Sequence, residues 1–273
     1  MTNIGIIGGG NIGEALFSGI IEDGADPKSI IVADPSEDRL NDLKDQYGVV
    51  VTTEGSEAAE SADLLFICVK PDIVPVVLED VSDVLDNNSN ESIIVSMAAG
   101  VTIGAMEKLL PAGTPVVRVM PNTPMLVGKG ASGIAGGRFA EESHLDQVKD
   151  TLSKVGAAVV VKEKDLDAVT AVSGSGPAYI FLVVESMIES AVQLGLPRPL
   201  AEKLAIANVE GAATMMAKNQ DGGDSPSVLR TKVTSPAGTT AAALRELEES
   251  GIRGAFFRAM EACKDRSEEL GKS

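Results

Sequence analysis

A glycine-rich segment near the N-terminus constrains the fold of this chain more than any other feature of its sequence. Residues 4–13 read IGIIGGGNIG, a short apolar strand that runs into the pattern G-x-G-x-x-G. In this pattern Gly8 permits a tight turn, Gly10 lets the backbone approach a pyrophosphate, and Gly13 lets helix and strand touch. The first amides of the helix then face the phosphates. The segment predicts a Rossmann dinucleotide-binding fold, with a glycine-rich turn that binds no ligand as the alternative.

The first 160 or so residues alternate short β-branched runs with helical segments, which is typical of parallel βαβ units. Continuous apolar strands such as residues 92–95 suit a sheet that is covered on both faces. The most loop-like tract in this half is 86–91. The expected strands are 3–7, 29–33, 49–51, 64–69, 92–97, 115–119, 130–135 and 157–161, and the expected helices are 12–22, 36–46, 73–84, 103–109 and 141–154.

Strand signals end after residue 164, and the rest of the chain is typical of helices. We expect an α/β protein with an N-terminal Rossmann domain, residues 1–164, and a C-terminal all-α dimerisation domain, residues 165–273. The expected helices are 167–194, 199–218, 225–231, 237–250 and 253–270.

The stretch 178–192 is apolar around most of its circumference, with Glu185 and Glu189 as its only charges. This pattern indicates a buried helix. Because five helices would hide such an element poorly, we expect a second copy of the chain to cover it.

The net charge of −17, from 40 acidic and 23 basic residues, argues against binding of nucleic acid or of an anionic membrane. We expect a salt-adapted host, with an ordinary acidic protein as the alternative. The two cysteines form no disulfide or zinc pattern, so no metal is expected. The first strand leaves no room for a signal peptide, and the apolar run 178–184 is too short to span a bilayer. We therefore expect a soluble, cytoplasmic protein.

The carboxyl ends of the strands are where a dinucleotide binds in such a sheet. Asp34 ends the second strand, where a carboxylate accepts a hydrogen bond from a ribose 2′-hydroxyl and favours NAD. Ser36 and Arg39 are close enough in sequence to accommodate NADP instead, and residues 34–36 are also typical of a simple turn. Lys70 and Asn122 have plain alternatives as a surface charge and a loop cap. The predicted cofactor-binding residues are Ile7, Gly8, Gly9, Gly10, Asn11, Ile12, Gly13, Asp34, Cys68, Val69, Lys70, Pro71, Met97, Ala98, Ala99 and Asn122.

A second segment, SPAGTT at residues 235–240, has the composition of a helix N-terminus that is open to an anion. Pro236 falls near the first helical turn, and small residues expose the amides that follow. A capped helix without a ligand, with Ser235 as the N-cap, is an equal alternative. The single histidine, His144, lies in a polar segment, and we find no catalytic triad. Chemistry in this chain must therefore use weak acids such as threonine hydroxyls, which suits reduction of an imine.

Together these segments resemble the pyrroline-5-carboxylate reductase family from end to end. The resemblance implies reduction of 1-pyrroline-5-carboxylate to L-proline with NADP(H) or NAD(H), in a homodimer or a ring of dimers. The segments that carry it are 8–13, 68–71, 97–103, 120–124, 167–170, 173–179, 233–240 and 249–253.

By match to the family motif, the amides of Thr239 and Thr240 hold the substrate carboxylate, and the Thr240 hydroxyl helps deliver a proton to the ring nitrogen. The predicted substrate-binding residues are Ser235, Gly238, Thr239, Thr240 and Glu163. Relatives often carry Gly-Gly where this chain has Ala237-Gly238, and many place Ser or Arg at the position of Asp34.

Two other functions stay open at this point. A β-hydroxyacid dehydrogenase shares the architecture but carries a lysine on the helix after its glycine-rich segment, and residues 177–180 here read PAYI. A dinucleotide-sensing protein would keep the fold without turnover.

Overall fold

The computed structural model describes residues 2–87 and 92–271 of the chain. It divides into two compact units, the first made of Met1–Pro177 with Ala262–Ser273 and the second of Ala178–Glu261. The chain therefore leaves the first unit once and returns to it at the end. These compact units differ from the functional division at residue 164 that the sequence predicts.

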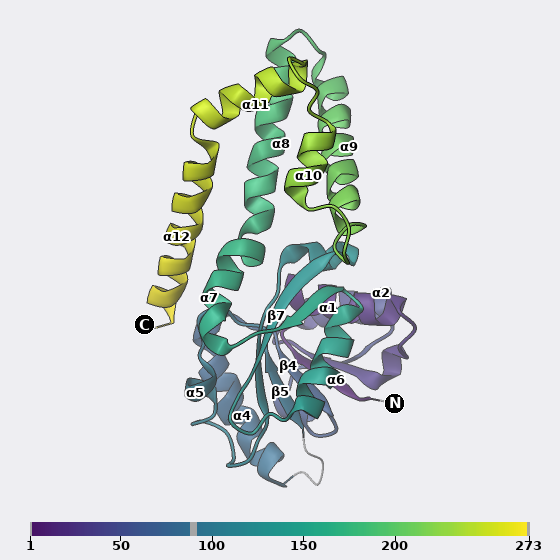
Figure 1. Ribbon diagram of the computed structural model, residues 1–273. Helices are drawn as coiled ribbons and strands as arrows, with labels where there is room; N and C mark the ends of the chain where they lie inside the picture. Colours follow the sequence, from purple (N-terminus) through teal and green to yellow (C-terminus); the bar gives the residue numbers. More distant parts are fainter. Residues whose placement is uncertain (1, 88–91, 272–273) are drawn as a thin grey trace. The chain divides into compact units, whose positions relative to one another are not determined.

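The first unit is built on a twisted sheet (Figure 1). Its eight strands have the order β3-β2-β1-β4-β5-β6-β7-β8. Its first six strands have the Rossmann order. All eight expected strands are present: β1 Ile4–Ile7, β2 Ile30–Ala33, β3 Val50–Thr52, β4 Leu64–Ile67, β5 Ile93–Ser96, β6 Val116–Met120, β7 Gly130–Gly136 and β8 Gly156–Val160.

The expectation of parallel pairing throughout is wrong at one position, because β6 and β7 are antiparallel. Only a short 3₁₀ segment, η3 Thr123–Val127, lies between them. A parallel crossover needs a dozen or more residues, so this connection permits only a reversal of direction.

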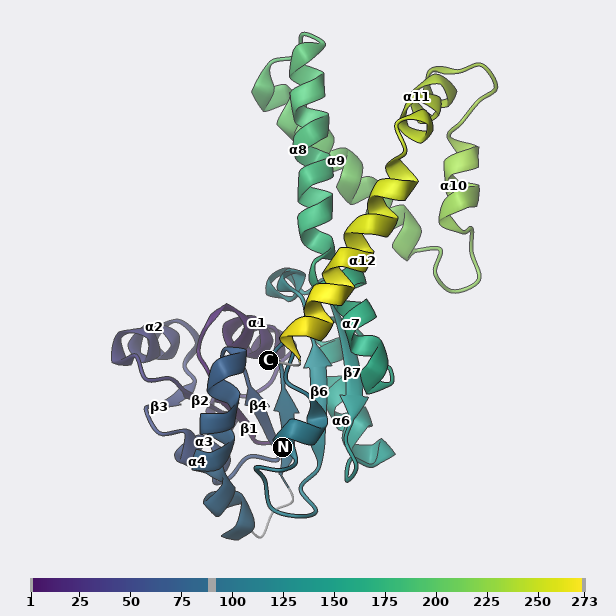
Figure 2. The same ribbon diagram turned by 90° about the vertical axis from the view of Figure 1, so that its left-hand side faces the viewer.

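Helices cover both faces of the sheet, as the apolar strands predict. Within β5, Ile93 and Val95 pack into one core, while Ile94 packs into the other. On the first face lie α1 Asn11–Glu22, α2 Glu37–Tyr47 and α6 Glu142–Ser153, and on the second α3 Gly55–Ala59, α4 Val74–Asn87 and α5 Ile103–Met106. Figure 2 shows α3 and α4 packed together on their face of the sheet. Short 3₁₀ turns precede β2 (η1 Pro27–Ser29) and α4 (η2 Pro71–Ile73).

The tract expected as a loop at 86–91 begins inside a helix, since α4 continues to Asn87. Residues 88–91 lie outside the described part of the chain.

The expected helix 167–194 is interrupted. It consists of η4 Glu163–Asp165, α7 Leu166–Val169, a π-helical turn η5 Thr170–Gly174, and α8 Gly176–Gln193. By length and composition this run of 31 residues is sufficient to cross a membrane, because an 18-residue window within it has a mean hydropathy of 1.3. The expectation that no segment is long enough rested on residues 178–184 alone, and the helical run extends well beyond them.

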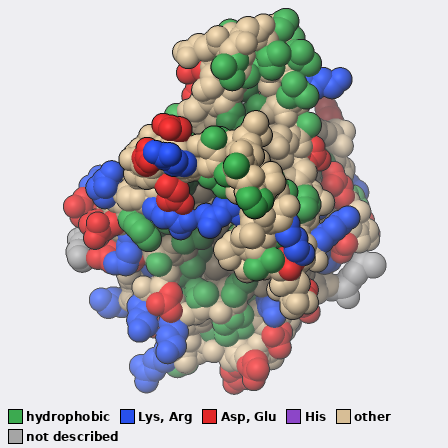
Figure 3. Space-filling view, turned by 45° about the horizontal axis from the view of Figure 1, so that its top comes forward, with side chains coloured by type: hydrophobic (Ala, Val, Ile, Leu, Met, Phe, Trp, Pro, Cys, Tyr) green, Lys and Arg blue, Asp and Glu red, His purple; other side chains and the backbone are tan. Residues whose placement is uncertain are grey.

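The second unit has almost no core of its own. It continues through α9 Arg198–Ala217, α10 Pro226–Lys232, α11 Thr239–Glu249 and the start of α12 Ile252–Leu270. Within residues 178–261, all of which are described, only Ala201 and Ala205 are buried. Phe181 and Leu182 on α8 are 67% and 62% exposed, so the expected burial of this helix does not occur within one chain. Hydrophobic side chains gather on this unit in the upper part of Figure 3.

The end of α12 belongs to the first unit and is bonded to it. The Ser267 hydroxyl donates to Asp167 Oδ1 at 2.6 Å, and the Cys263 thiol donates to the Ser175 hydroxyl oxygen at 3.2 Å. Ser267 is buried. These contacts attach the last helical turns to the region of α7.

Candidate dinucleotide-binding and active site

Each of the three fingerprint positions, 8, 10 and 13, has a different structural reason to be glycine. Gly8 has a φ of +107°, and a Cβ there would lie 2.8 Å from the Cys68 carbonyl oxygen. A Cβ on Gly13 would lie 2.2 Å from the Gly8 carbonyl oxygen. A Cβ on Gly10 would meet no described atom within 4 Å. The chain's own packing therefore requires the first and third glycines, whereas the second leaves open space that a side chain would occupy.

This open space lies at the N-terminus of α1. Gly10 is the N-cap residue, and no side chain in the described ranges accepts a hydrogen bond from the helix start. The amides of Asn11 and Ile12 thus begin a 12-residue helix whose dipole is positive at this end. The arrangement fits the pyrophosphate of a dinucleotide.

A cavity of about 610 Å³ adjoins the glycine-rich loop. Its volume is within the usual range for a small-molecule site. The predicted residues that line it are Ile7, Gly8, Gly10, Asp34, Cys68, Val69 and Lys70.

The sequence-based prediction missed the opposite wall of this cavity. Thr53 follows β3 as Asp34 follows β2, and this shared position at a strand end was the available signal. Ile73 and Val76 are 42% and 64% exposed and give the wall an apolar surface.

The other predicted cofactor residues do not line this cavity. They are Gly9, Asn11, Ile12, Gly13, Pro71, Met97, Ala98, Ala99 and Asn122. Met97 and Ala98 are buried at the end of β5. The Asn122 side chain accepts a hydrogen bond from the Ala131 amide at 2.8 Å and donates one to the Ser173 carbonyl at 3.0 Å. This geometry is that of a loop cap, the alternative role for Asn122.

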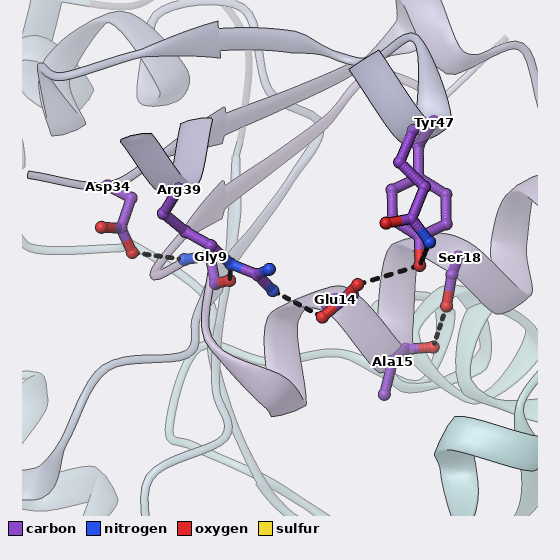
Figure 4. A network of polar contacts seen from close by, with 8 residues as sticks. Gly9, Glu14, Ala15, Ser18, Asp34, Arg39 and Tyr47 are labelled. Atoms are coloured by element: carbon purple, nitrogen blue, oxygen red, sulfur yellow. Dashed lines mark hydrogen bonds and ion pairs between the residues drawn. The ribbon is translucent and has the colours of Figure 1, made fainter. Parts of the chain in front are cut away.

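Asp34 is bonded to the glycine-rich loop. Its Oδ2 accepts from the Gly9 amide at 2.9 Å (Figure 4). Its Oδ1 accepts from the Ser36 amide at 3.0 Å. The second bond forms the turn that was the alternative interpretation of residues 34–36. A carboxylate has capacity for about four hydrogen bonds. Asp34 can therefore hold the loop and still accept a hydroxyl donor from the cavity.

Cys68 lines the same cavity, but its thiol is not a nucleophile at neutral pH. Burial raises the pKa of this thiol to about 12. Among the residues that the structure describes, no group of three or more His, Cys, Asp or Glu side chains is arranged to hold a metal ion.

Glu163, predicted to contact substrate, binds two groups of the first unit. Its Oε1 accepts from the Ile103 amide at 2.7 Å and from Arg118 Nη1 at 3.3 Å. The Arg118 side chain is only 8% exposed. Glu163 therefore acts as the counterion of a buried guanidinium and fixes the start of α5.

In the second unit, residues 235–238 form a tight turn. The Gly238 amide donates to the Ser235 carbonyl at 3.1 Å, and Ala237 has a φ of +59°. Proline at the second position and a positive φ at the third are the pattern of a type II turn. A helix cannot include that φ value, so the expected helix start at residue 237 is wrong, as is the alternative in which Ser235 is the N-cap.

Helix α11 instead begins at Thr239, with Gly238 as its N-cap. Within the described chain no side chain caps this end. The amides of Thr239 and Thr240 therefore point out of the first turn of an 11-residue helix, an arrangement that suits a carboxylate.

The sheet order, the open space at Gly10 and the uncapped start of α1 define a Rossmann-type dinucleotide-binding protein. Residues 3–100 match the family model for NADP oxidoreductase, coenzyme F420-dependent, and residues 163–270 match the model for pyrroline-5-carboxylate reductase dimerisation. A pyrroline-5-carboxylate reductase from Corynebacterium melassecola is 59% identical over 272 residues, covering 100% of both chains. The chain belongs to the pyrroline-5-carboxylate reductase family.

Solved structures agree with this assignment. A pyrroline-5-carboxylate reductase from Coxiella burnetii has a TM-score of 0.94 and 37% identity, covering 100% of this chain and 99% of that one. The pyrroline carboxylate reductase of Plasmodium falciparum, solved with NADP bound, has a TM-score of 0.85 and 30% identity, covering 99% and 98%.

Proposed function

We propose that this chain reduces the cyclic imine 1-pyrroline-5-carboxylate to L-proline with NAD(P)H, the final step of proline biosynthesis. Its likeness to reductases of that name extends over the full chain at 59% identity. One observation carries the substrate assignment: the 11-residue helix α11 starts, after the turn at 235–238, with no described side chain capping it. An uncapped helix start of this kind is the feature that an acidic substrate needs.

The residues of the first unit fit a dinucleotide. The open space at Gly10 and the amides of Asn11 and Ile12 would hold its pyrophosphate. Asp34 would accept a hydrogen bond from the adenosine ribose, and Ile73 and Val76 would contact the adenine. The reduced nicotinamide supplies a hydride when it is bound.

In the second unit, we assign the amides of Thr239 and Thr240 to the substrate carboxylate. Ser235 and Gly238 shape this end of the helix, because a Cβ on Gly238 would lie 2.3 Å from the Ser235 hydroxyl oxygen. The Thr240 hydroxyl would donate a hydrogen bond to the imine nitrogen and help deliver its proton. A threonine is a weak acid, so holding the imine in position contributes most of the rate.

We also propose that a second copy of the chain, and not lipid, covers the apolar surface of α8. Only two residues of the second unit are buried, and residues 163–270 match a model named for dimerisation. Sedimentation at micromolar concentration should show a dimer or a ring of dimers without detergent. A stable monomer would contradict the proposal.

The deciding assay is oxidation of NADH and of NADPH in the presence of 1-pyrroline-5-carboxylate. Turnover that depends on the imine supports the reductase, whereas binding of dinucleotide without turnover supports the sensing alternative. The absence of a lysine at 177–180 stands against a β-hydroxyacid dehydrogenase.

Adaptation to high salt, absence of nucleic-acid binding and a cytoplasmic location stay predictions. The net charge of −17 supports the first of them. Thermal melts in low and in molar salt test it, because equal stability in both would refute it.

A further inference from the structure

A network of charged and polar side chains surrounds the middle residue of the glycine-rich loop (Figure 4). The Gly9 amide donates to Asp34 Oδ2 at 2.9 Å, and the Gly9 carbonyl accepts from Arg39 Nε at 2.8 Å. Asp34 and Arg39 thus contact the two polar backbone atoms of one residue. A guanidinium therefore lies beside the position at which Asp34 would receive the ribose.

The Arg39 guanidinium is already paired with an acid. Its Nη2 donates to Glu14 Oε2 at 2.5 Å, and the two side chains are 30% and 19% exposed. Because both groups are partly buried, solvent screens this pair less than it screens a pair on the surface.

The second carboxylate oxygen of Glu14 also has a partner, which fixes the position of the side chain. Its Oε1 accepts a hydrogen bond from the Tyr47 hydroxyl at 2.9 Å, and the Tyr47 ring packs edge-on against Phe17. Burial, and then the hydrogen bond to Glu14, raise the pKa of Tyr47, so the hydroxyl stays a donor at neutral pH. The acid that pairs with Arg39 is therefore fixed between two helices, α1 and α2.

We infer that Glu14 sets the choice between NADH and NADPH, by holding and neutralising the Arg39 guanidinium that would otherwise bind a 2′-phosphate. The inference rests on the proposed function as a dinucleotide-dependent reductase. A 2′-phosphate carries nearly two negative charges and needs a cation with open donors. With Arg39 bound to Glu14, and with Asp34, Glu37 and Asp38 close by along the chain, this edge disfavours the phosphate and prefers NADH.

The test is direct binding of the two reduced dinucleotides, measured by their fluorescence, with calorimetry of 2′,5′-ADP and ADP as a second readout. Glu14→Gln should tighten NADPH and 2′,5′-ADP by about tenfold while NADH and ADP change less than about twofold. The gain should shrink at high salt. The double variant Glu14→Gln with Arg39→Gln should not show this gain in NADPH affinity, because the guanidinium is then absent.

Glu22→Gln is the matched control, since it removes the same charge from an exposed position on the same helix. It should leave the ratio of the two affinities unchanged. Arg39→Gln alone provides a second measurement if Glu14→Gln fails to fold. It should change both affinities equally, because the guanidinium that it removes is already neutralised.

If Glu14→Gln folds and its ratio of NADPH affinity to NADH affinity is unchanged, the inference is overturned. A selective loss of NADPH affinity in Arg39→Gln would also overturn it. Either result with normal binding of NADH would leave the reductase assignment intact. If the unaltered chain binds neither dinucleotide, the proposed function fails together with this inference.

Discussion

Gly8 and Gly13 contact each other so closely that a Cβ on Gly13 would lie 2.2 Å from the Gly8 carbonyl oxygen. The contact fixes the start of α1 against the end of β1. Gly10, between them in the chain, has no described atom within 4 Å of its Cβ position. The fold therefore requires glycine at position 13, whereas glycine at position 10 leaves space for a ligand.

Gly13→Ala should destabilise the first unit by about 1–3 kcal/mol, because the added methyl forces loop and helix apart. Gly10→Ala should leave stability within about 0.5 kcal/mol, since its φ of −71° and ψ of −173° suit alanine. It should nevertheless weaken dinucleotide binding by at least about tenfold, because the methyl fills the space for the pyrophosphate. Urea unfolding and fluorescence titration measure the two effects. Normal affinity in Gly10→Ala would contradict a pyrophosphate at this position.

Thr240→Ala should lower kcat by about 10–100-fold, the low end of general acid–base effects. Thr240→Ser keeps the hydroxyl and should restore most of the rate. Steady-state kinetics with 1-pyrroline-5-carboxylate measures both variants. Unchanged kinetics in the alanine variant would remove the proposed role of this hydroxyl.

Ala237→Gly should stabilise the protein by about 1 kcal/mol, because alanine is strained at the φ of +59° that the turn requires. Ala243→Gly is the control inside α11, where glycine should destabilise by about 1 kcal/mol. Urea unfolding at one fixed protein concentration compares them. If both variants lower the free energy of unfolding, the turn at residue 237 is not strained.

Glu163→Ala should lower the free energy of unfolding by about 2 kcal/mol, since it leaves the buried Arg118 guanidinium and the Ile103 amide without their acceptor. Glu163→Gln keeps an acceptor oxygen, so it should lower the free energy of unfolding by a smaller amount. If Glu163 acts on the substrate alone, stability will not change and KM will rise instead. Denaturation and kinetics on the same preparations separate the two roles.

Cys68 should make stability depend on pH in the alkaline range. Burial raises the pKa of its thiol from 9.0 to about 12, so the unfolded thiol loses its proton before the folded one does. Its contribution is fully present below pH 9 and is lost as the pH rises towards 12. Between pH 7 and 11, the free energy of unfolding of Cys68→Ala should therefore decline less steeply than that of the unaltered chain. Parallel pH profiles would refute this assignment.

Local patterns predicted the parts of the fold that have local causes. The strand, turn and helix around Gly8 follow from a fingerprint of a few residues, and the eight strands follow from short β-branched runs. The direction of β7 depends on the length of the connection before it and on its partner strand, so periodicity alone missed it. The start of α11 was placed too early, because the positive φ of Ala237 is not visible in an alanine.

The candidate site was predicted in part for the same reason. The glycine loop, Asp34 and Lys70 lie at strand ends that the sequence identifies. Val76 faces them from a helix more than forty residues later than Asp34, and no motif connects the two. The bonds of Glu14 to Arg39 and of Glu163 to Arg118 join residues 25 and 45 positions apart, which only the tertiary fold brings together.

The return of α12 to the first unit has a consequence for synthesis on the ribosome. The glycine loop emerges first, but the Ser267 that bonds Asp167 is made only after the whole second unit. A nascent chain therefore carries a nearly complete dinucleotide-binding sheet while its final contacts are still missing. Completion of that unit has to wait until α12 has been synthesised.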